Sequence, residues 1–169
     1  MTPAPTIEQG KVRHAAPLQH YWTNLRIPAN EDFPRTGEVS LTDLITRLGS
    51  YAERTDAAMF VAREGDTVVG VADAEGDAEG TMNLVLTVHQ KHRRRGIGKA
   101  LLRAALAWAE QTPSLHRAQL QVLGDNEPAR RLYDAHGFSP SGPPRQLLRR
   151  ASREIWDQTM VRPLTAARS

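Results

Sequence analysis

A short basic segment with two closely spaced glycines carries the clearest chemical signal in the chain. It reads Arg93-Arg94-Arg95-Gly96-Ile97-Gly98-Lys99, and Lys91 lies just before it. Glycine has no side chain to keep a ligand away from backbone N–H groups. The arginines and lysines add mobile positive charge around those groups. These residue types at this spacing suit a polyanion, so we predict that a diphosphate or a similar group binds here.

Two secondary-structure elements are expected to position this segment. Before it, residues 82–88 alternate between apolar and other positions, which predicts a strand. After it, Ile97, Leu101, Ala105 and Trp108 fall on one helical face, which predicts a helix ending near residue 111. The first N–H groups of a helix have no partner within the helix, and the helix dipole adds partial positive charge there. The sequence therefore predicts an anion site at a helix N-terminus.

The spacing of the glycines excludes two common phosphate-binding loops. The Walker pattern G-x-x-x-x-G-K-[ST] is absent. The dinucleotide pattern G-x-G-x-x-G is absent as well, because no third glycine follows Gly98 in step.

A second group of residues downstream also has a chemical interpretation. A helix is predicted over 128–136, with Tyr133 on the face that also carries Ala129 and Leu132, so its side chain points toward the sheet. From the residues alone, Tyr133 is a packing residue whose hydroxyl bonds to a neighbour, or a proton donor. Asn126 is expected to cap the N-terminus of this helix.

The two segments resemble the motifs of the GNAT-type N-acetyltransferases. Arg93 to Gly98 matches [RQ]-x-x-G-x-[GA], and Asn126 to Phe138 matches N-x-x-A-x-x-x-Y-x-x-x-G-F. The resemblance implies acetyl-CoA as co-substrate, direct transfer of the acetyl group to a primary amine, and no metal. The residues implied to bind the cofactor are Leu86, Thr87, Val88, Arg93, Arg94, Arg95, Gly96, Ile97, Gly98, Lys99, Ala100 and Asn126.

The resemblance also implies roles for individual groups. Tyr133 would be the catalytic residue that donates a proton to the leaving thiolate of CoA. A backbone amide within Leu86–Val88, beside a bulge, would meet the oxyanion of the tetrahedral intermediate. That bulge would separate this strand from the next one, at 116–123, and the pantetheine arm would lie in the gap. Asn126 would hydrogen-bond the pantetheine arm or an ordered water.

The general base and the acceptor stay open. Many family members place a glutamate on the strand before the basic loop, whereas this strand carries no carboxylate. The alternatives for the base are His89, Asp73, Glu75, Glu154 and an ordered water held by Asn83 or Thr87. By analogy the acceptor lies between the first two helices and the final hairpin. Glu31, Asp32 and Glu38 in the loop 27–39 either attract the ammonium group of the acceptor or are solvated loop charges, and Trp22, Phe33 and Trp156 either line an apolar pocket or pack in the core.

Composition restricts the other possibilities. With 169 residues and 40% hydrophobic residues, the chain suits one globular domain over 1–169. It has no cysteine, no apolar run near the roughly 18 residues that span a membrane, and no secretory pattern at its start, so we expect a cytoplasmic protein without membrane contact. The net charge is +3, with basic residues gathered at 91–99 and 145–153.

Two other functions compete with that of an acetyltransferase. A nucleic-acid-binding module would use the two basic clusters, but aromatic residues are not interleaved with them. A non-catalytic CoA-binding regulator of the same fold is the second alternative, because the strand carboxylate is missing. The resemblance further implies a possible homodimer formed through the last strands.

The expected fold belongs to the α/β (α+β) class. It is a single-domain, mixed, mostly antiparallel sheet of six to seven strands flanked by about four helices, as in the resembled family. Strands 82–88 and 116–123 should run parallel, because a helix connects them. The remaining expected elements are a flexible tail at 1–9, strands at 11–15, 58–63, 67–74, 138–141 and 154–162, and helices at 17–26 and from Thr42, as N-cap, to Tyr51, with Ile45 facing inward.

Overall fold

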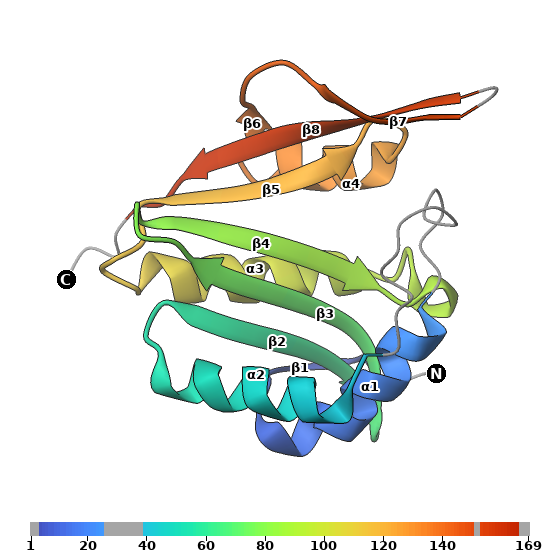
Figure 1. Cartoon of the computed structure of the whole chain (residues 1–169), viewed down its shortest axis with the longest axis vertical. Coiled ribbons are helices and arrows are strands. Elements are labelled where there is room, and N and C mark those ends of the chain that lie inside the picture. The colour runs from blue at the N-terminus through green and yellow to red at the C-terminus, as the bar shows by residue number, and fades with distance from the viewer. Residues whose placement is uncertain (1–3, 26–38, 151–152, 166–169) are drawn as a thin grey trace.

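The computed structural model of the chain describes residues 4–25, 39–150 and 153–165 (Figure 1). The strands are β1 (Thr6–Gln9), β2 (Ala57–Glu64), β3 (Thr67–Gly76), β4 (Thr81–Val88), β5 (Arg117–Leu123), β6 (Ser139–Pro140), β7 (Arg145–Arg150) and β8 (Arg153–Pro163). The helices are α1 (Ala15–Asn24), α2 (Leu41–Glu53), α3 (Ile97–Glu110) and α4 (Glu127–Asp134), together with the short 3-10 helices η1 (Val12–His14) and η2 (Gln90–His92).

All described strands belong to one mixed sheet. Its order is β1-β2-β3-β4-β5-β8-β6, and β7 pairs with β8 beside this path. Every pairing is antiparallel except that of β4 with β5, which is parallel as predicted. The mostly antiparallel sheet with four α-helices is therefore confirmed. The sheet has eight described strands instead of the predicted six to seven, and β7 is the additional one.

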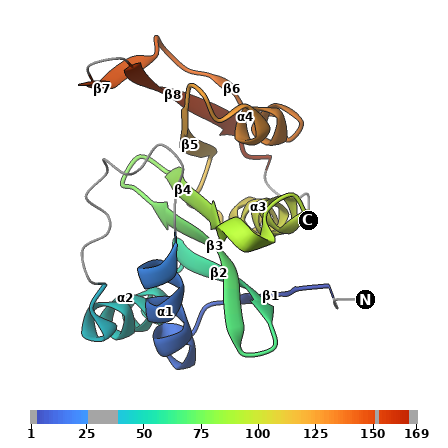
Figure 2. The ribbon, with the colours of Figure 1, turned by 90° about the vertical axis from the view of Figure 1, so that its right-hand side faces the viewer.

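Helices cover both faces of the sheet, with α1 and α2 on one side and α3 and α4 on the other (Figure 2). The alternation along β2 shows why. Ala58, Phe60 and Ala62 belong to the core under α3, whereas Met59 and Val61 belong to the core under α1 and α2. Because successive side chains of a strand point to opposite faces, a strand that is apolar at every position is buried on both.

A close approach between β3 and α3 fixes where the helix begins. A Cβ atom on Gly70 would lie 2.9 Å from Leu101 Cδ1 and 3.0 Å from Ile97 Cγ2, so any larger residue there would force these side chains of α3 to shift. Ile97 and Leu101 are buried in consequence. The start of α3, where the anion site was predicted, is therefore held directly against the sheet.

The N-terminal expectations need correction. Residues 6–9 form the edge strand β1 rather than a tail, because Glu8 pairs with Arg63 of β2 (2.6 Å) and the backbones form a ladder. Residues 12–14, expected within a strand, form η1, in which the backbone N–H of Lys11 donates to His14 Nδ1.

Two details of α2 also differ from the sequence expectation. Ser40, not Thr42, is the N-cap and accepts from the backbone N–H of Asp43. Ile45 is 42% exposed instead of facing inward. The expected loop at 27–39 lies almost wholly outside the described residues, as do Glu31, Asp32, Phe33 and Glu38.

Candidate active site

Strands β4 and β5 pair over a short distance and then separate (Figure 1). Their parallel register runs from Thr81↔Arg117 to Asn83↔Gln119. Beyond that point a cavity of about 280 Å³ opens between them. It is lined by Asn83, Leu84, Val85, Leu86, Gln119, Leu120, Gln121 and Tyr133. This cavity, called the inter-strand gap below, lies where the sequence predicted the pantetheine arm.

The β-bulge that was expected to cause this separation is not found in the β3–β4 ladder. The register of β3 and β4 continues without a shift from Gly70↔Val88 to Gly76↔Met82. The separation arises on the other side of β4, because β5 pairs with β8 over its whole length, from Arg117↔Pro163 to Leu123↔Asp157. Along this stretch β5 therefore stays paired with β8, and β4 stays paired with β3.

The N-terminus of α3 lies close to Leu86, which lines the inter-strand gap. Gly96 is its N-cap, with a left-handed φ of 78° that glycine adopts readily. The first α-helical hydrogen bond runs from Ala100 N–H to Gly96 C=O, so the N–H groups of Ile97, Gly98 and Lys99 precede the ladder.

Gly98 links this helix start to the wall of the gap. A Cβ atom on Gly98 would lie 3.6 Å from Leu132 Cδ2 and 3.7 Å from Val88 Cγ2. These are ordinary van der Waals distances, and Leu86, which lines the gap, is 4.0 Å away. The first turn of α3 therefore lies beside the apolar wall of the gap.

The arginines of the basic loop are not all directed toward a ligand. Arg93 Nε donates to the C=O of Val88 (3.0 Å), which ties the loop to the end of β4. Arg95 forms an ion pair with Glu64 Oε1 (2.8 Å) at the end of β2. His92 Nδ1 lies 3.3 Å from Glu64 Oε2. Arg94, with φ of 60°, and Lys99 are exposed beside the helix start.

Glu64 was missed by the sequence interpretation. Its side chain is only 16% exposed and holds the loop through Arg95 and His92. The sequence gives no signal for this contact, because Glu64 and the basic loop are distant in the chain and meet only in the folded structure.

Tyr133 lines the inter-strand gap from α4. The residue is buried, and its ring centroid lies 5.9 Å from that of Phe138. In the part of the chain that the structure describes, its hydroxyl has no hydrogen-bond partner. Burial raises the pKa of Tyr133 to about 12, so the phenol keeps its proton at neutral pH. The arrangement presents a protonated hydroxyl to the gap.

The other predicted site residues take two positions. Asn126 caps α4, and its side-chain oxygen accepts from the backbone N–H of Ala129 (3.3 Å). Thr87 lies on the opposite face of β4 from Leu86, where its hydroxyl accepts from Tyr21 of α1 (2.9 Å). The structure thus brings Leu86, Val88, Gly98 and Tyr133 together and turns the Thr87 side chain toward α1.

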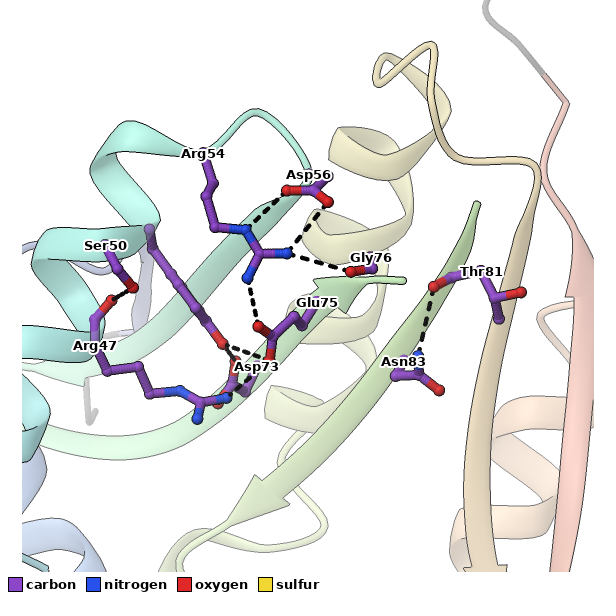
Figure 3. Close-up of polar contacts among 10 residues, drawn as sticks. Arg47, Ser50, Arg54, Asp56, Asp73, Glu75, Gly76, Thr81 and Asn83 are labelled. Atoms are coloured by element: carbon purple, nitrogen blue, oxygen red, sulfur yellow. Dashed lines mark hydrogen bonds and ion pairs between the residues drawn. The ribbon is translucent and has the colours of Figure 1, made fainter. Parts of the chain in front are cut away.

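Two carboxylates of β3 lie beside β4 on the face of α1 and α2 (Figure 3). Asp73 is opposite Val85, and Glu75 is opposite Asn83. Arg47 of α2 forms an ion pair with Asp73 (2.9 Å), and the Tyr51 hydroxyl donates to the same carboxylate (2.9 Å). Burial raises the pKa of Asp73, an effect that the charge of Arg47 opposes.

Arg54 completes this network by bridging Asp56 and Glu75 and by donating to the C=O of Gly76 (Figure 3). Of the other groups considered as a base, His89 is partly buried, and this burial lowers its pKa. The side chain of Glu154 lies outside the described part of the structure. Within the described part, no helix is long and apolar enough to cross a membrane.

Comparison with known proteins identifies relatives of this chain. A model of the Acetyltransferase (GNAT) family matches residues 19–138. A mycothiol acetyltransferase of Corynebacterium diphtheriae is 35% identical over 123 residues, which make up 72% of this chain and 36% of that protein. The mycothiol acetyltransferase of Beutenbergia cavernae is 32% identical over 128 residues, covering 72% of this chain and 41% of its own length. The chain thus spans about two fifths of the length of these relatives.

Solved structures show the same fold. A GNAT-family acetyltransferase from Streptococcus pneumoniae superposes with a TM-score of 0.83 at 20% identity, covering 95% of this chain and 99% of the other. A putative acetyltransferase from Salmonella typhimurium, solved with acetyl-CoA, gives a TM-score of 0.79 at 18% identity, covering 99% and 98%. Together with the matched family model, the inter-strand gap and the glycine-bearing helix start show that this chain belongs to the GNAT family of acetyltransferases.

Proposed function

We propose that the chain is an acetyl-CoA-dependent N-acetyltransferase that moves an acetyl group directly from the CoA thioester to a primary amine. The observation that carries the proposal is that Tyr133 lines the inter-strand gap and that Gly98, at the start of α3, lies beside Leu86 in the wall of the same gap. A linear molecule with a diphosphate at one end of a flexible arm and a thioester at the other suits this shape.

Each part of the gap takes one part of acetyl-CoA. The N–H groups of Ile97, Gly98 and Lys99 hold the pyrophosphate, with the helix dipole adding partial positive charge. The apolar wall around Leu86 and Leu120 contacts the pantetheine arm. The backbone of β4 beyond Asn83 has no β5 partner, so its polar groups are free to bond the arm and the thioester carbonyl.

The reaction then needs one nucleophile and one proton donor. The neutral amine attacks the thioester carbon, and negative charge develops on the carbonyl oxygen, where a fixed backbone N–H stabilises it. When the tetrahedral intermediate collapses, the C–S bond breaks and the Tyr133 hydroxyl donates its proton to the sulfur. The attacking nitrogen loses one proton to water or to a carboxylate, and the candidates are Asp73 and Glu75, which lie opposite the gap-lining residues Val85 and Asn83 in the β3–β4 ladder.

A thiol-release assay tests the proposal. Purified protein is mixed with acetyl-CoA and a panel of amines, and free CoA is measured beside the mass of the acetylated product. The panel includes a peptide N-terminus, a lysine derivative, a polyamine and the desacetyl form of mycothiol, since the two relatives are mycothiol acetyltransferases. We expect amine-dependent release of CoA with at least one acceptor.

Matched variants at Gly98 separate binding from turnover. Gly98→Glu places a carboxylate where the pyrophosphate would lie, and we expect it to abolish release, whereas Gly98→Ala retains activity because a Cβ atom fits. Thermal stabilisation by acetyl-CoA without turnover on any amine would support a non-catalytic CoA-binding protein. A salt-dependent shift with DNA or RNA, and no effect of acetyl-CoA, would support a nucleic-acid-binding module.

A further inference from the structure

A second cavity, of about 370 Å³, lies beyond the end of β5, between α4, β8 and the loop that leads into β7. Its lining is Gly124, Arg130, Pro144, Trp156, Asp157 and Gln158. The Trp156 side chain is large, apolar and 40% exposed. Gln158 is buried, and its Nε2 donates to the C=O of Gly142 (3.1 Å), which fixes the loop that carries Pro144. The wall of this second cavity is therefore fixed by hydrogen bonding between β8 and the loop before β7.

The same two elements that line the inter-strand gap also line this second cavity. Gln121 of β5 borders the gap, and Gly124, the first residue after β5, borders the cavity; three residues of extended chain span about 10 Å. On α4, Tyr133 borders the gap and Arg130 borders the cavity, a separation of about one helical turn. The second cavity thus lies next to the inter-strand gap, at a separation that one small acceptor molecule would span.

The charges of the lining favour an anion. Asp157 is buried, and Arg145 neutralises it through two hydrogen bonds of 2.8 Å and 3.2 Å. Arg130 is half-buried, and among the described residues its guanidinium has no ion-pair or hydrogen-bond partner. Its neighbour Arg131, in contrast, pairs with Glu127 (3.0 Å) on the exposed side of α4. Among the described residues, the lining therefore holds Arg130 without a counter-charge, together with the indole of Trp156.

We infer that this second cavity binds the far end of the acceptor, and that the acceptor carries a carboxylate next to an apolar or aromatic group, about 10 Å from the amine. Arg130 pairs with the carboxylate through its planar guanidinium, and Trp156 contacts the apolar group. Arg130 is thus a specificity-determining residue. This inference rests on the proposed function, since it names the class of acceptor for that reaction.

The experiment compares Gly-Gly-Phe with its C-terminal amide. The two peptides have the same amine and the same aromatic side chain, and they differ only in the carboxylate. For the wild type we expect KM for the acid to be about tenfold lower than KM for the amide, the size of one charge-assisted contact. Arg130→Gln removes this difference and leaves KM for acetyl-CoA unchanged. Arg131→Gln, the matched control on the same helix, keeps the difference.

A binding measurement separates failure of this inference from failure of the proposed function. Calorimetric titration with N-acetyl-Gly-Gly-Phe and with its amide needs no turnover. Tighter binding of the acid that Arg130→Gln removes supports the cavity even where CoA release is absent. Equal affinity of the wild type for acid and amide overturns the inference, and so does a loss in Arg130→Gln that is confined to acetyl-CoA. Melting curves of both variants confirm that each is folded.

Discussion

Replacing Tyr133 by Phe removes one oxygen atom from the wall of the inter-strand gap and leaves the ring in place. The ring keeps its contact with Phe138, and the hydroxyl has no hydrogen-bond partner among the described residues. Because no bond is broken, we expect the free energy of unfolding to change by less than about 1 kcal/mol. If Tyr133 is the proton donor, kcat in the thiol-release assay falls by about 10²- to 10⁴-fold, as is typical of a lost general acid.

The pH dependence gives this prediction a second readout. Burial raises the pKa of Tyr133 from 10.0 to about 12, so the native state holds the phenolic proton to higher pH than the unfolded state does. The contribution of this group to stability is complete below pH 10 and is lost as the pH rises toward 12. Denaturant titrations should therefore show that the wild type loses stability relative to Tyr133→Phe in that window.

Tyr51→Phe is the control for a tyrosine hydroxyl that is bonded. The Tyr51 hydroxyl donates to Asp73 (2.9 Å), so its removal should cost about 1.5–3 kcal/mol of stability while kcat stays within about tenfold of the wild type. A Tyr133→Phe protein with full kcat would refute the proposed role of Tyr133. A variant that lost stability and activity together would refute the claim that the hydroxyl has no structural partner.

Three further predictions concern a support of the cofactor loop, the start of α3 and the turn between β3 and β4. Glu64→Gln removes the charge that holds Arg95 (2.8 Å), so KM for acetyl-CoA should rise by about 3- to 10-fold with kcat unchanged, whereas a fall in kcat alone would contradict this role. Gly98→Ala should keep stability within about 1 kcal/mol, because the nearest atom to a Cβ there is 3.6 Å away, and thermal denaturation measures this. Gly80→Ala should lose about 2 kcal/mol or more in the same measurement, because φ is +74° and a Cβ would lie 2.7 Å from the C=O of Ser114; an unchanged melting temperature would contradict it.

The sequence predicted the centre of the fold well, because local patterns determine it. The alternation of residues 82–88 predicted β4, and the helical period after Gly96 predicted α3. Because a helix connects β4 to β5, the two strands were expected to run parallel, as they do. Tyr133 was placed on the inward face of α4 by the same periodicity, and the structure puts it in the gap. Asn126 was correctly expected to cap α4.

The features that the sequence did not predict depend on tertiary contacts. β1 is a strand because it pairs with β2, and its four residues have no strong pattern of their own. The expected free cations of the loop include Arg93, which donates to Val88, and Arg95, which pairs with Glu64. An arginine's partner cannot be read from spacing when it lies on a distant strand. The expected bulge in β4 is not found, because the separation of β4 and β5 depends on another tertiary contact, the pairing of β5 with β8.

The central claim is that the N–H groups at the start of α3 hold the pyrophosphate of CoA. Titration of ¹⁵N-labelled protein with CoA, followed by amide NMR, tests it directly, with pantetheine as the control that lacks the pyrophosphate. We expect the backbone N–H resonances of Ile97, Gly98 and Lys99 to move with CoA occupancy and to stay in place with pantetheine. If CoA binds while these three resonances remain unchanged, the anion site lies elsewhere and the account is contradicted.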